Sequence, residues 1–62
     1  MNDRTVVVLF VDGTRKNFKD VESYWHDLAH ECFFIEAKTD STVMLPDSNV
    51  KVIGFKEDVD ND

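Results

Sequence analysis

The apolar run RTVVVLFV, at residues 4 to 11, constrains the fold more than any other stretch of this chain. It is dominated by β-branched and aromatic residues, which is typical of a β-strand. Successive side chains of a strand point to opposite faces. Both faces are apolar here, with Val6, Val8 and Phe10 on one and Val7, Leu9 and Val11 on the other. Such a strand belongs in the middle of a sheet, where both of its faces are covered.

A tight turn is indicated directly after this strand. Asp12-Gly13 is a dipeptide favoured by two-residue hairpin loops, because both of its positions tolerate a positive φ. Residues 14 to 18 are therefore expected to form a second strand that pairs back on the first.

The hydrophobic period changes in residues 20 to 32. Apolar side chains recur there at helical spacing, at Val21, Tyr24, Trp25, Leu28, Ala29 and Cys32. Asp20 is suited to cap the first turn, where its carboxylate would also meet the positive end of the helix dipole. The pattern predicts an amphipathic helix. The alternative, a strand ending near Tyr24, would require a turn within WHDLAHE, which contains neither glycine nor proline.

Three further strands are expected after this helix, in CFFIEAK, STVMLP and VKVIGF, with turns at TDS and DSN. The predicted element order is β-β-α-β-β-β. The fold class is therefore α+β, a four- to five-stranded mainly antiparallel sheet with one amphipathic helix on one face. Because one helix covers only one face, the apolar residues left on the other face predict a dimer or a partner interface.

The length of the chain, 62 residues, indicates one domain near the lower limit for a core without disulfides or metals. We expect a compact domain at residues 1 to 55 and an acidic C-terminal tail at residues 56 to 62. Cys32 is the single cysteine, so no internal disulfide forms, and no apolar run is long enough for a signal peptide or a membrane span. These features favour a soluble protein of the reducing cytoplasm.

The net charge of −6 bears on the kind of partner. Four acids and one lysine in residues 56 to 62 account for half of it. The basic residues form no stripe along the sequence, which argues against direct binding of nucleic acid. An acidic surface instead suits a basic protein partner.

The strongest candidate for an enzyme motif is HDLAH, from His26 to His30. Two histidines four apart with an intervening acid are similar to the zinc metalloprotease pattern His-Glu-x-x-His. Catalytic zinc also needs a third protein ligand and a cleft, which we do not expect in so short a chain. We interpret both as surface histidines and leave open whether the pair binds a metal. Cys32 lies on the apolar arc of the expected helix, where its thiolate is disfavoured. We therefore predict a protein with no catalytic activity and no cofactor.

The segment DSTVMLPD, residues 40 to 47, has two interpretations. In the first, it is a core strand with Val43 and Leu45 facing the helix and Thr42 and Met44 facing away. In the second, the strand that Pro46 ends is an edge strand, whose polar start is offered to a partner. Two readings also remain for the aromatic pair Tyr24 and Trp25, as core residues or as interface anchors.

The same segment, extended to residue 56, resembles the phage uracil-DNA glycosylase inhibitors. DSTVMLPDSNVKVIGFK shares with them an acid and a serine that open a strand, Met-Leu-Pro that closes it and Val-Ile-Gly that follows. That family consists of small acidic proteins that imitate DNA and occupy the DNA-binding groove of the enzyme. The resemblance implies that Asp40 and Ser41 make phosphate-like contacts, with Thr42 next to them at a position that is aliphatic in the family. It also implies an apolar pocket that is lined in part by Met44, Leu45, Val52 and Ile53.

Two functions therefore emerge as hypotheses. The leading one is a phage-type inhibitor that mimics DNA and blocks uracil-DNA glycosylase, a DNA-processing enzyme, in the cytoplasm of the host cell. The alternative is a non-enzymatic structural or regulatory domain that dimerises or docks through an uncovered apolar sheet face. Both hypotheses name a protein partner, with neither nucleic acid nor membrane bound directly.

Overall fold

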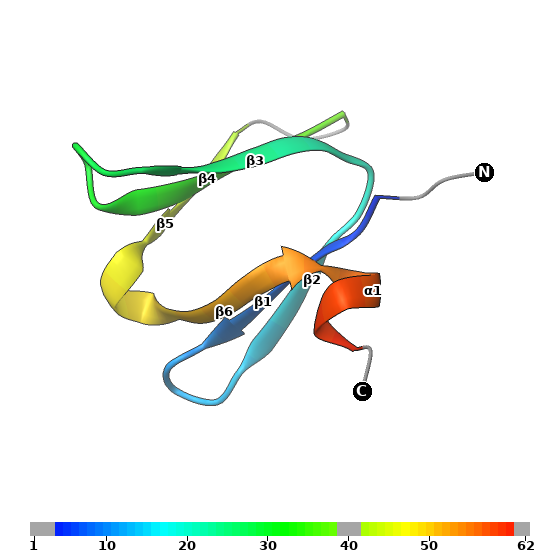
Figure 1. Ribbon diagram of the computed structural model, residues 1–62, viewed down its shortest axis with the longest axis horizontal. Helices are drawn as coiled ribbons and strands as arrows, with labels where there is room; N and C mark the ends of the chain where they lie inside the picture. The colour runs from blue at the N-terminus through cyan, green and yellow to red at the C-terminus, as the bar shows by residue number, and fades with distance from the viewer. Residues whose placement is uncertain (1–3, 39–41, 61–62) are drawn as a thin grey trace.

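The structure, a computed structural model, describes residues 4–38 and 42–60 and contains two three-stranded antiparallel sheets (Figure 1). Sheet A has the order β2-β1-β6 and consists of β1 (Val6–Phe10), β2 (Arg15–Phe18) and β6 (Val50–Phe55). Sheet B has the order β3-β4-β5 and consists of β3 (Val21–Asp27), β4 (Cys32–Ala37) and β5 (Val43–Pro46). A 3-10 turn, η1 (Asp47–Asn49), precedes β6, and a single helical turn, α1 (Lys56–Val59), follows it.

The chain first crosses from sheet A to sheet B at Asp20, between β2 and β3. Asp20 has a φ of 55°, in the left-handed region that aspartate tolerates better than most residues. The N–H of Val21 donates to the carbonyl of Arg4 at 2.9 Å, and the N–H of Lys38 donates to the carbonyl of Asp20 at 3.0 Å. This corner therefore ties the two sheets together through backbone hydrogen bonds.

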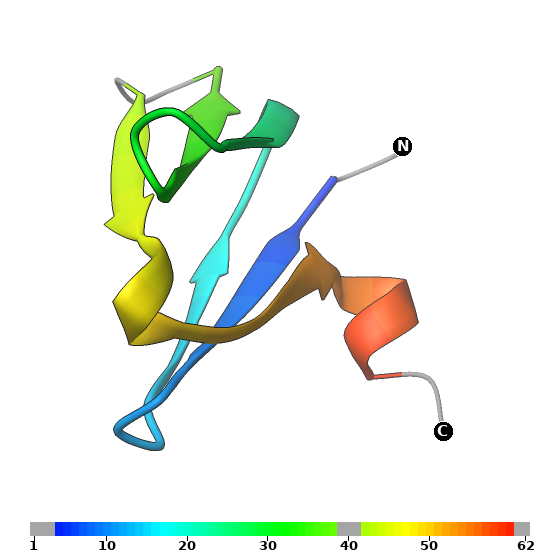
Figure 2. The ribbon, with the colours of Figure 1, turned by 60° about the vertical axis from the view of Figure 1, so that its left-hand side comes forward.

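The chain returns to sheet A through η1, as Figure 2 shows. There the N–H of Val11 donates to the carbonyl of Asn49, and the N–H of Asp47 donates to the carbonyl of Glu31, both at 3.0 Å. These bonds connect η1 to the ends of both sheets. Each sheet is consequently held against the other at two corners.

The core lies between the two sheets. Its buried residues are Val6 and Val8 of β1, Val21 of β3, Ile35 of β4 and Leu45 of β5. Eight partly buried hydrophobic residues pack around them: Phe10, Phe18, Tyr24, Phe33, Val43, Val50, Ile53 and Phe55. The prediction of a central strand at residues 4 to 11 is confirmed, because β1 lies between β2 and β6.

The β1–β2 hairpin is present, but its loop has three residues instead of the expected two. The N–H of Phe10 donates to the carbonyl of Thr14 at 2.8 Å, and the N–H of Gly13 donates to the carbonyl of Phe10 at 3.0 Å. Gly13 has a φ of 94°, which a residue with a side chain rarely adopts. Gly13 thus supplies the positive φ that the turn requires, as the sequence indicates, but at the last position of a three-residue loop.

The amphipathic helix predicted for residues 20 to 32 is wrong. Residues 21 to 27 form β3, and residues 32 to 37 form β4, its antiparallel partner. The pairing register shifts between Val21 and Ser23, so Val21 and Tyr24 both pack in the core although they are three positions apart in the sequence. A regular strand would place residues three positions apart on opposite faces, whereas the bulge places these two on the same face. Their spacing therefore resembles the spacing of residues on one face of a helix.

The β3–β4 turn forms without glycine or proline. Glu31 adopts a φ of 52°, and the carboxylate of Asp27 accepts a hydrogen bond from the N–H of His30 at 3.1 Å. The side chain of Asp27 thus organises the turn, and Glu31 takes the conformation for which glycine is usually needed. The rejected alternative, a strand followed by a turn within WHDLAHE, is therefore correct, although the strand continues beyond Tyr24.

Glu31→Gly is expected to stabilise the protein by up to about 1 kcal/mol, since relief of the left-handed strain exceeds the added entropy of the unfolded chain. The backbone carbonyl of Glu31 keeps its hydrogen bond to Asp47 in this variant. Urea denaturation followed by circular dichroism measures the change. Glu31→Ala is the control, since alanine keeps the strain, and its stability should equal that of the wild type. A glycine variant no more stable than the alanine variant would contradict this account.

The helical turn α1 lies on the outer face of sheet A, opposite the core (Figure 1). The Cγ2 atom of Val59 is 3.2 Å from the position that a Cβ on Gly54 would occupy, so the absence of a side chain there permits close approach. Val7 pairs with Gly54 and is fully buried, outside the central cluster. The carboxylate of Asp60 holds the end of α1 through ion pairs to Arg15 at 2.9 Å and Lys56 at 3.2 Å. This part of the acidic C-terminal segment is therefore packed on the domain.

The observed fold consists mostly of antiparallel strands with one short helix, which agrees with the α+β class. The strand count and order differ from the prediction, since six strands form two sheets and the helix follows the last strand. Neither η1 nor α1, the helical segments in the described ranges, has the length and apolar character needed to cross a membrane.

Candidate functional site

The outer face of sheet B carries three large apolar side chains in one row. Trp25 of β3 is the cross-strand partner of Phe34 of β4, which in turn is the partner of Met44 of β5. Their sequence neighbours Tyr24, Ile35, Val43 and Leu45 pack in the core. Because side chains alternate along a strand, the three residues point away from the core. We refer to Trp25, Phe34 and Met44 as the aromatic stripe.

The aromatic stripe is ordered and accessible at the same time. The rings of Trp25 and Phe34 are stacked, with centroids 5.5 Å apart and an interplanar angle of 23°. Trp25 is 43% exposed and Met44 is 59% exposed, whereas Phe34 is half-buried between them. The helical turn α1 covers part of the opposite side of the molecule, on sheet A. An accessible row of this kind is a common feature of protein-binding surfaces, which are enriched in tryptophan, phenylalanine and methionine.

Polar residues border the stripe on both sides. On one side, Ser23 pairs with Glu36 across the strands, and its hydroxyl lies 3.4 Å from a carboxylate oxygen of Glu36. On the other side, Asp27 pairs with Cys32, and its carboxylate accepts a hydrogen bond from Nδ1–H of His30 at 3.0 Å. The apolar row therefore lies between two carboxylates on the same sheet face.

The negative charge of the chain is concentrated in the segment that builds sheet B. Residues 20 to 49 contain seven acids and one lysine, so they carry the entire net charge of −6. The remaining residues contain six acids and six basic residues and are balanced, because the net charge of −3 in residues 56 to 62 is offset by +3 in residues 1 to 19 and 50 to 55. An electrostatic asymmetry of this kind orients a charged partner toward one side of a protein.

The residues implied by the glycosylase-inhibitor resemblance lie in different parts of the fold. Asp40 and Ser41 lie outside the described residues. Thr42 is exposed just before β5, and Met44 belongs to the aromatic stripe. Leu45 is buried in the core, whereas Ile53 is partly buried against it. Val52 pairs with Leu9 in sheet A and is 39% exposed. Met44 and Val52 thus lie on different sheets.

The position of β5 agrees with the second interpretation of the segment at residues 40 to 47. In the described part of the chain, β5 pairs only with β4, which makes it an edge strand of sheet B. Its alternation also agrees with the first interpretation, because Val43 and Leu45 point to the core and Met44 points away. The two interpretations are therefore compatible in the structure.

The two histidines do not share a helical face, since His26 lies in β3 and His30 in the following turn. Nε2–H of His26 donates to the carboxylate of Asp47 at 2.8 Å, and the imidazole ring lies against Phe33 with centroids 4.5 Å apart. Within residues 4–38 and 42–60, no three side chains of histidine, cysteine or acidic residues form a cluster suited to a metal ion. Each histidine instead pairs with one aspartate.

Cys32 is buried, with 1% of its surface exposed. Burial, followed by the nearby charges of Asp27 and Asp47, raises the pKa of its thiol above the usual value. The neutral thiol is therefore favoured, and the side chain acts as a small hydrophobic residue. This confirms the burial expected from the sequence, although the residue begins a strand and not the end of a helix.

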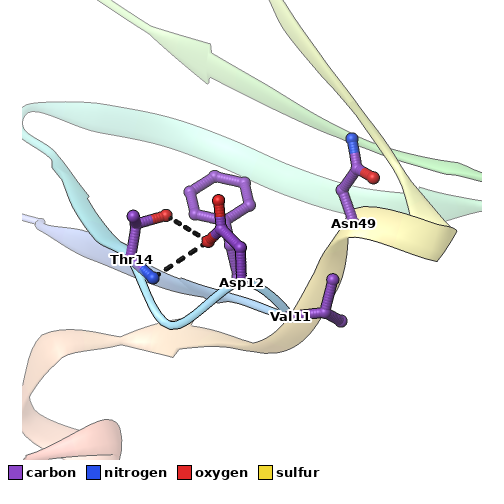
Figure 3. A pocket seen from close by; sticks show the side chains of 5 residues that line it. Val11, Asp12, Thr14 and Asn49 are labelled. Atoms are coloured by element: carbon purple, nitrogen blue, oxygen red, sulfur yellow. Dashed lines mark hydrogen bonds between the residues drawn. The ribbon is translucent and has the colours of Figure 1, made fainter.

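A cavity of about 350 Å³ lies between the β1–β2 hairpin and η1 (Figure 3). It is lined by Phe10, Val11, Asp12, Thr14 and Asn49. One carboxylate oxygen of Asp12 accepts hydrogen bonds from the N–H of Thr14 at 3.0 Å and from its hydroxyl at 2.7 Å. These bonds hold the hairpin loop, so the turn itself accounts for the position of this carboxylate.

Stability is expected to fall as the pH decreases below about 4, where carboxylates become protonated. Hydrogen bonds lower the pKa of three aspartates below the usual 3.8: those from Thr14 to Asp12, from His30 to Asp27, and from Arg15 and Lys56 to Asp60. A lowered pKa in the folded state stabilises the ionised protein, and this contribution is lost as the pH falls through that pKa. Urea midpoints measured from pH 7 to pH 2.5 test the prediction. Asp12→Asn should show a smaller acid-induced decrease than the wild type, and a midpoint that does not change would refute the proposed linkage.

No protein-family model, curated protein or solved structure gives a significant match to this chain. Functional inference therefore depends on the geometry of the molecule. Phe34 is one of the apolar residues that the sequence leaves over for an uncovered sheet face, but it was not among the expected site residues, although it completes the aromatic stripe. Its role follows only when β3 is recognised as a strand, because Trp25 and Phe34 then become cross-strand partners.

Proposed function

We propose that this protein is a non-enzymatic interaction domain that binds a protein partner through the outer face of sheet B. The observation that carries the proposal is the aromatic stripe, in which Trp25, Phe34 and Met44 are aligned across three strands and both Trp25 and Met44 are exposed. Association would bury this apolar surface, and the fixed strands would limit the entropy lost on binding.

Two features support this role. The stacked rings of Trp25 and Phe34 are already positioned next to each other, which suits them as anchors in a partner's pocket. The polar border, with Glu36 and Asp27, provides the charged rim that surrounds the apolar centre of many interfaces. The proposed activity requires neither a cofactor nor a catalytic residue, and we place it in the reducing cytoplasm because Cys32 would remain a free thiol there.

The proposal is tested by capture of partners from a bacterial lysate on the immobilised protein. The wild type is compared with Trp25→Ala and with Val52→Ala, which removes an exposed apolar side chain from sheet A. We expect the same partner on the wild type and Val52→Ala and its loss on Trp25→Ala. Analytical ultracentrifugation of the three proteins shows whether the partner is a second copy of the chain. If the three proteins retain identical partners and have identical oligomeric states, the proposed surface is wrong.

Inhibition of uracil-DNA glycosylase is a second candidate function. The edge position of β5 favours it, because an edge strand leaves backbone groups available to a partner. The concentration of negative charge in residues 20 to 49 also suits a basic DNA-binding groove. In this proposal Asp40 and Ser41 contact the groove, and Met44 of the adjoining strand supplies an apolar contact.

An excision assay on a uracil-containing oligonucleotide distinguishes this candidate. We expect the purified protein to inhibit a purified uracil-DNA glycosylase in competition with DNA, and the inhibition to weaken as salt concentration rises. Unchanged excision at a micromolar excess of the protein would exclude this target. The interaction-domain proposal would survive that result, because it does not depend on the glycosylase.

A further inference from the structure

We infer that the aromatic stripe binds an arginine-rich segment of a partner protein, with a guanidinium group placed over the aromatic rings and next to the bordering carboxylates. This inference rests on the proposed function and specifies the chemistry of the partner. It follows from the combination of an apolar aromatic row and negative charge on one sheet face.

The electrostatic argument starts from the distribution of charge. Residues 20 to 49 contain seven acids against one lysine, whereas the rest of the chain is balanced. Two of these acids, Glu36 and Asp27, belong to the same outer sheet face as Trp25, by strand alternation and register. The carboxylate of Asp27 is already bonded to His30, whereas that of Glu36 contacts only the neutral hydroxyl of Ser23 within the described residues. A neutral or acidic segment would leave the charge of Glu36 without a cation, and a cationic segment would neutralise it.

The aromatic argument distinguishes arginine from lysine. Among the aromatic side chains, tryptophan attracts cations most strongly through cation–π interaction. Trp25 is 43% exposed, so its indole ring can be reached by a partner's side chain. A guanidinium group is planar and weakly hydrated, so it stacks on an aromatic face and still donates hydrogen bonds to a neighbouring carboxylate. An ammonium group is strongly hydrated and makes the same contact less favourably. Arginine is therefore the cation that this surface matches best.

The protein itself contains a contact between a guanidinium group and an aromatic ring, made by Arg4 and Phe55. The guanidinium carbon of Arg4 lies 5.0 Å from the centroid of the Phe55 ring, and one of its nitrogens donates to the carbonyl of Glu22 at 3.2 Å. Arg4 thus combines a ring contact with a hydrogen bond to an oxygen. The inferred contact at Trp25 has the same two components, supplied between two chains.

The single tryptophan makes the inference directly measurable, because all tryptophan fluorescence comes from the stripe. The probe is a synthetic arginine-glycine repeat peptide, compared with lysine-glycine and glutamate-glycine repeats of equal length. We expect saturable changes in Trp25 emission with the arginine peptide, weaker binding of the lysine peptide and no binding of the glutamate peptide. The affinity for the arginine peptide should decrease as salt increases.

A pair of charge-reversal variants localises the binding. Glu36→Lys should weaken binding of the arginine peptide by about tenfold or more, because it places a like charge beside the stripe. Glu57→Lys is the control, since it changes the net charge equally but lies in α1 on the other sheet. An equal effect of both variants would overturn the inference, because only the net charge would then matter.

Other outcomes separate this inference from the proposed function. If the arginine peptide leaves Trp25 emission unchanged while partner capture depends on Trp25, the inference is wrong and the interaction surface stands. Dimerisation through the stripe that the peptide cannot displace also overturns the inference, because the occupant is then a second copy. If capture does not depend on Trp25, the surface itself is wrong and both proposals fall.

Discussion

Ile35→Ala is expected to destabilise the protein by about 2–5 kcal/mol, the range for truncation of a large aliphatic residue in a packed core. Ile35 is fully buried in the centre of β4 and pairs with Tyr24 of β3 on one side and with Val43 of β5 on the other. Removal of its side chain leaves a cavity between the two sheets. Because β4 is hydrogen-bonded to β3 and to β5, its backbone cannot move enough to close this cavity. A chain of 62 residues has a total stability of roughly 3–9 kcal/mol, so the variant should lose a large share of its free energy of unfolding.

Urea denaturation with far-ultraviolet circular dichroism measures this effect. Ile35→Val is the graded control and should cost only about 0.5–1.5 kcal/mol, since it removes a single methylene group. Leu28→Ala is the surface control, because Leu28 lies in the β3–β4 turn and is 80% exposed, and its effect should stay within about 0.5 kcal/mol. Equal effects of Ile35→Ala and Leu28→Ala would mean that the two sheets do not share the core described above.

Trp25→Ala is expected to separate binding from folding. The side chain lies on the outer face of sheet B and stacks on Phe34, so its loss removes a pair worth about 0.5–1.5 kcal/mol in addition to the apolar area that the ring buries. Its loss from the proposed interface should weaken binding by at least about 2 kcal/mol, or about 30-fold, as is usual for a central aromatic anchor.

Isothermal titration calorimetry with the captured partner, or with the arginine peptide, measures the affinity, and circular dichroism confirms the fold of the variant. Trp25→Phe should retain part of the affinity, since a smaller ring still stacks on Phe34 and still presents a π face. Val52→Ala should bind as the wild type does, because Val52 lies in sheet A. A variant Trp25→Ala that binds normally would remove the aromatic stripe from the interface.

The strands with strong local signals could be predicted from the sequence. β1 was recognised by its β-branched run, the hairpin by Asp12-Gly13, and β6 by VKVIGF, which matches the observed Val50–Phe55. The edge position of β5 was one of the two interpretations of its segment, and Pro46 favoured it because proline cannot donate the backbone hydrogen bond that an interior strand needs. In each case a residue type restricts the backbone locally, without help from distant contacts.

The segment from residue 20 to residue 32 was predicted wrongly because its signals are not local. Its apolar spacing fits a helix, yet in the structure the bulge after Val21 brings only Val21 and Tyr24 to the core, whereas Trp25 faces outward and Leu28 is exposed in the turn. The turn at Glu31 contains no glycine, and a backbone hydrogen bond from Asp47 to Glu31 accompanies it. Helix propensity is a weak preference that tertiary packing overrides.

The candidate site was affected by the same error. On a helix, Trp25 belonged to the buried arc, whereas on β3 it points outward beside Phe34 and Met44. The aromatic stripe joins residues 25, 34 and 44, and this neighbourhood exists only after two hairpins have formed. No spacing rule within one element could have grouped them.

The sequence by itself determined the central apolar strand, the glycine turn, the end of a strand at Pro46 and the acidic balance of the chain, because these depend on covalent geometry, side-chain type and charge. Only the tertiary structure decided that residues 21 to 27 form a strand, that the strands divide into two sheets, and that Trp25 faces outward. The physical reason is that strand pairing is a contact between distant residues. Its register, and not the local pattern, determines which face each side chain occupies.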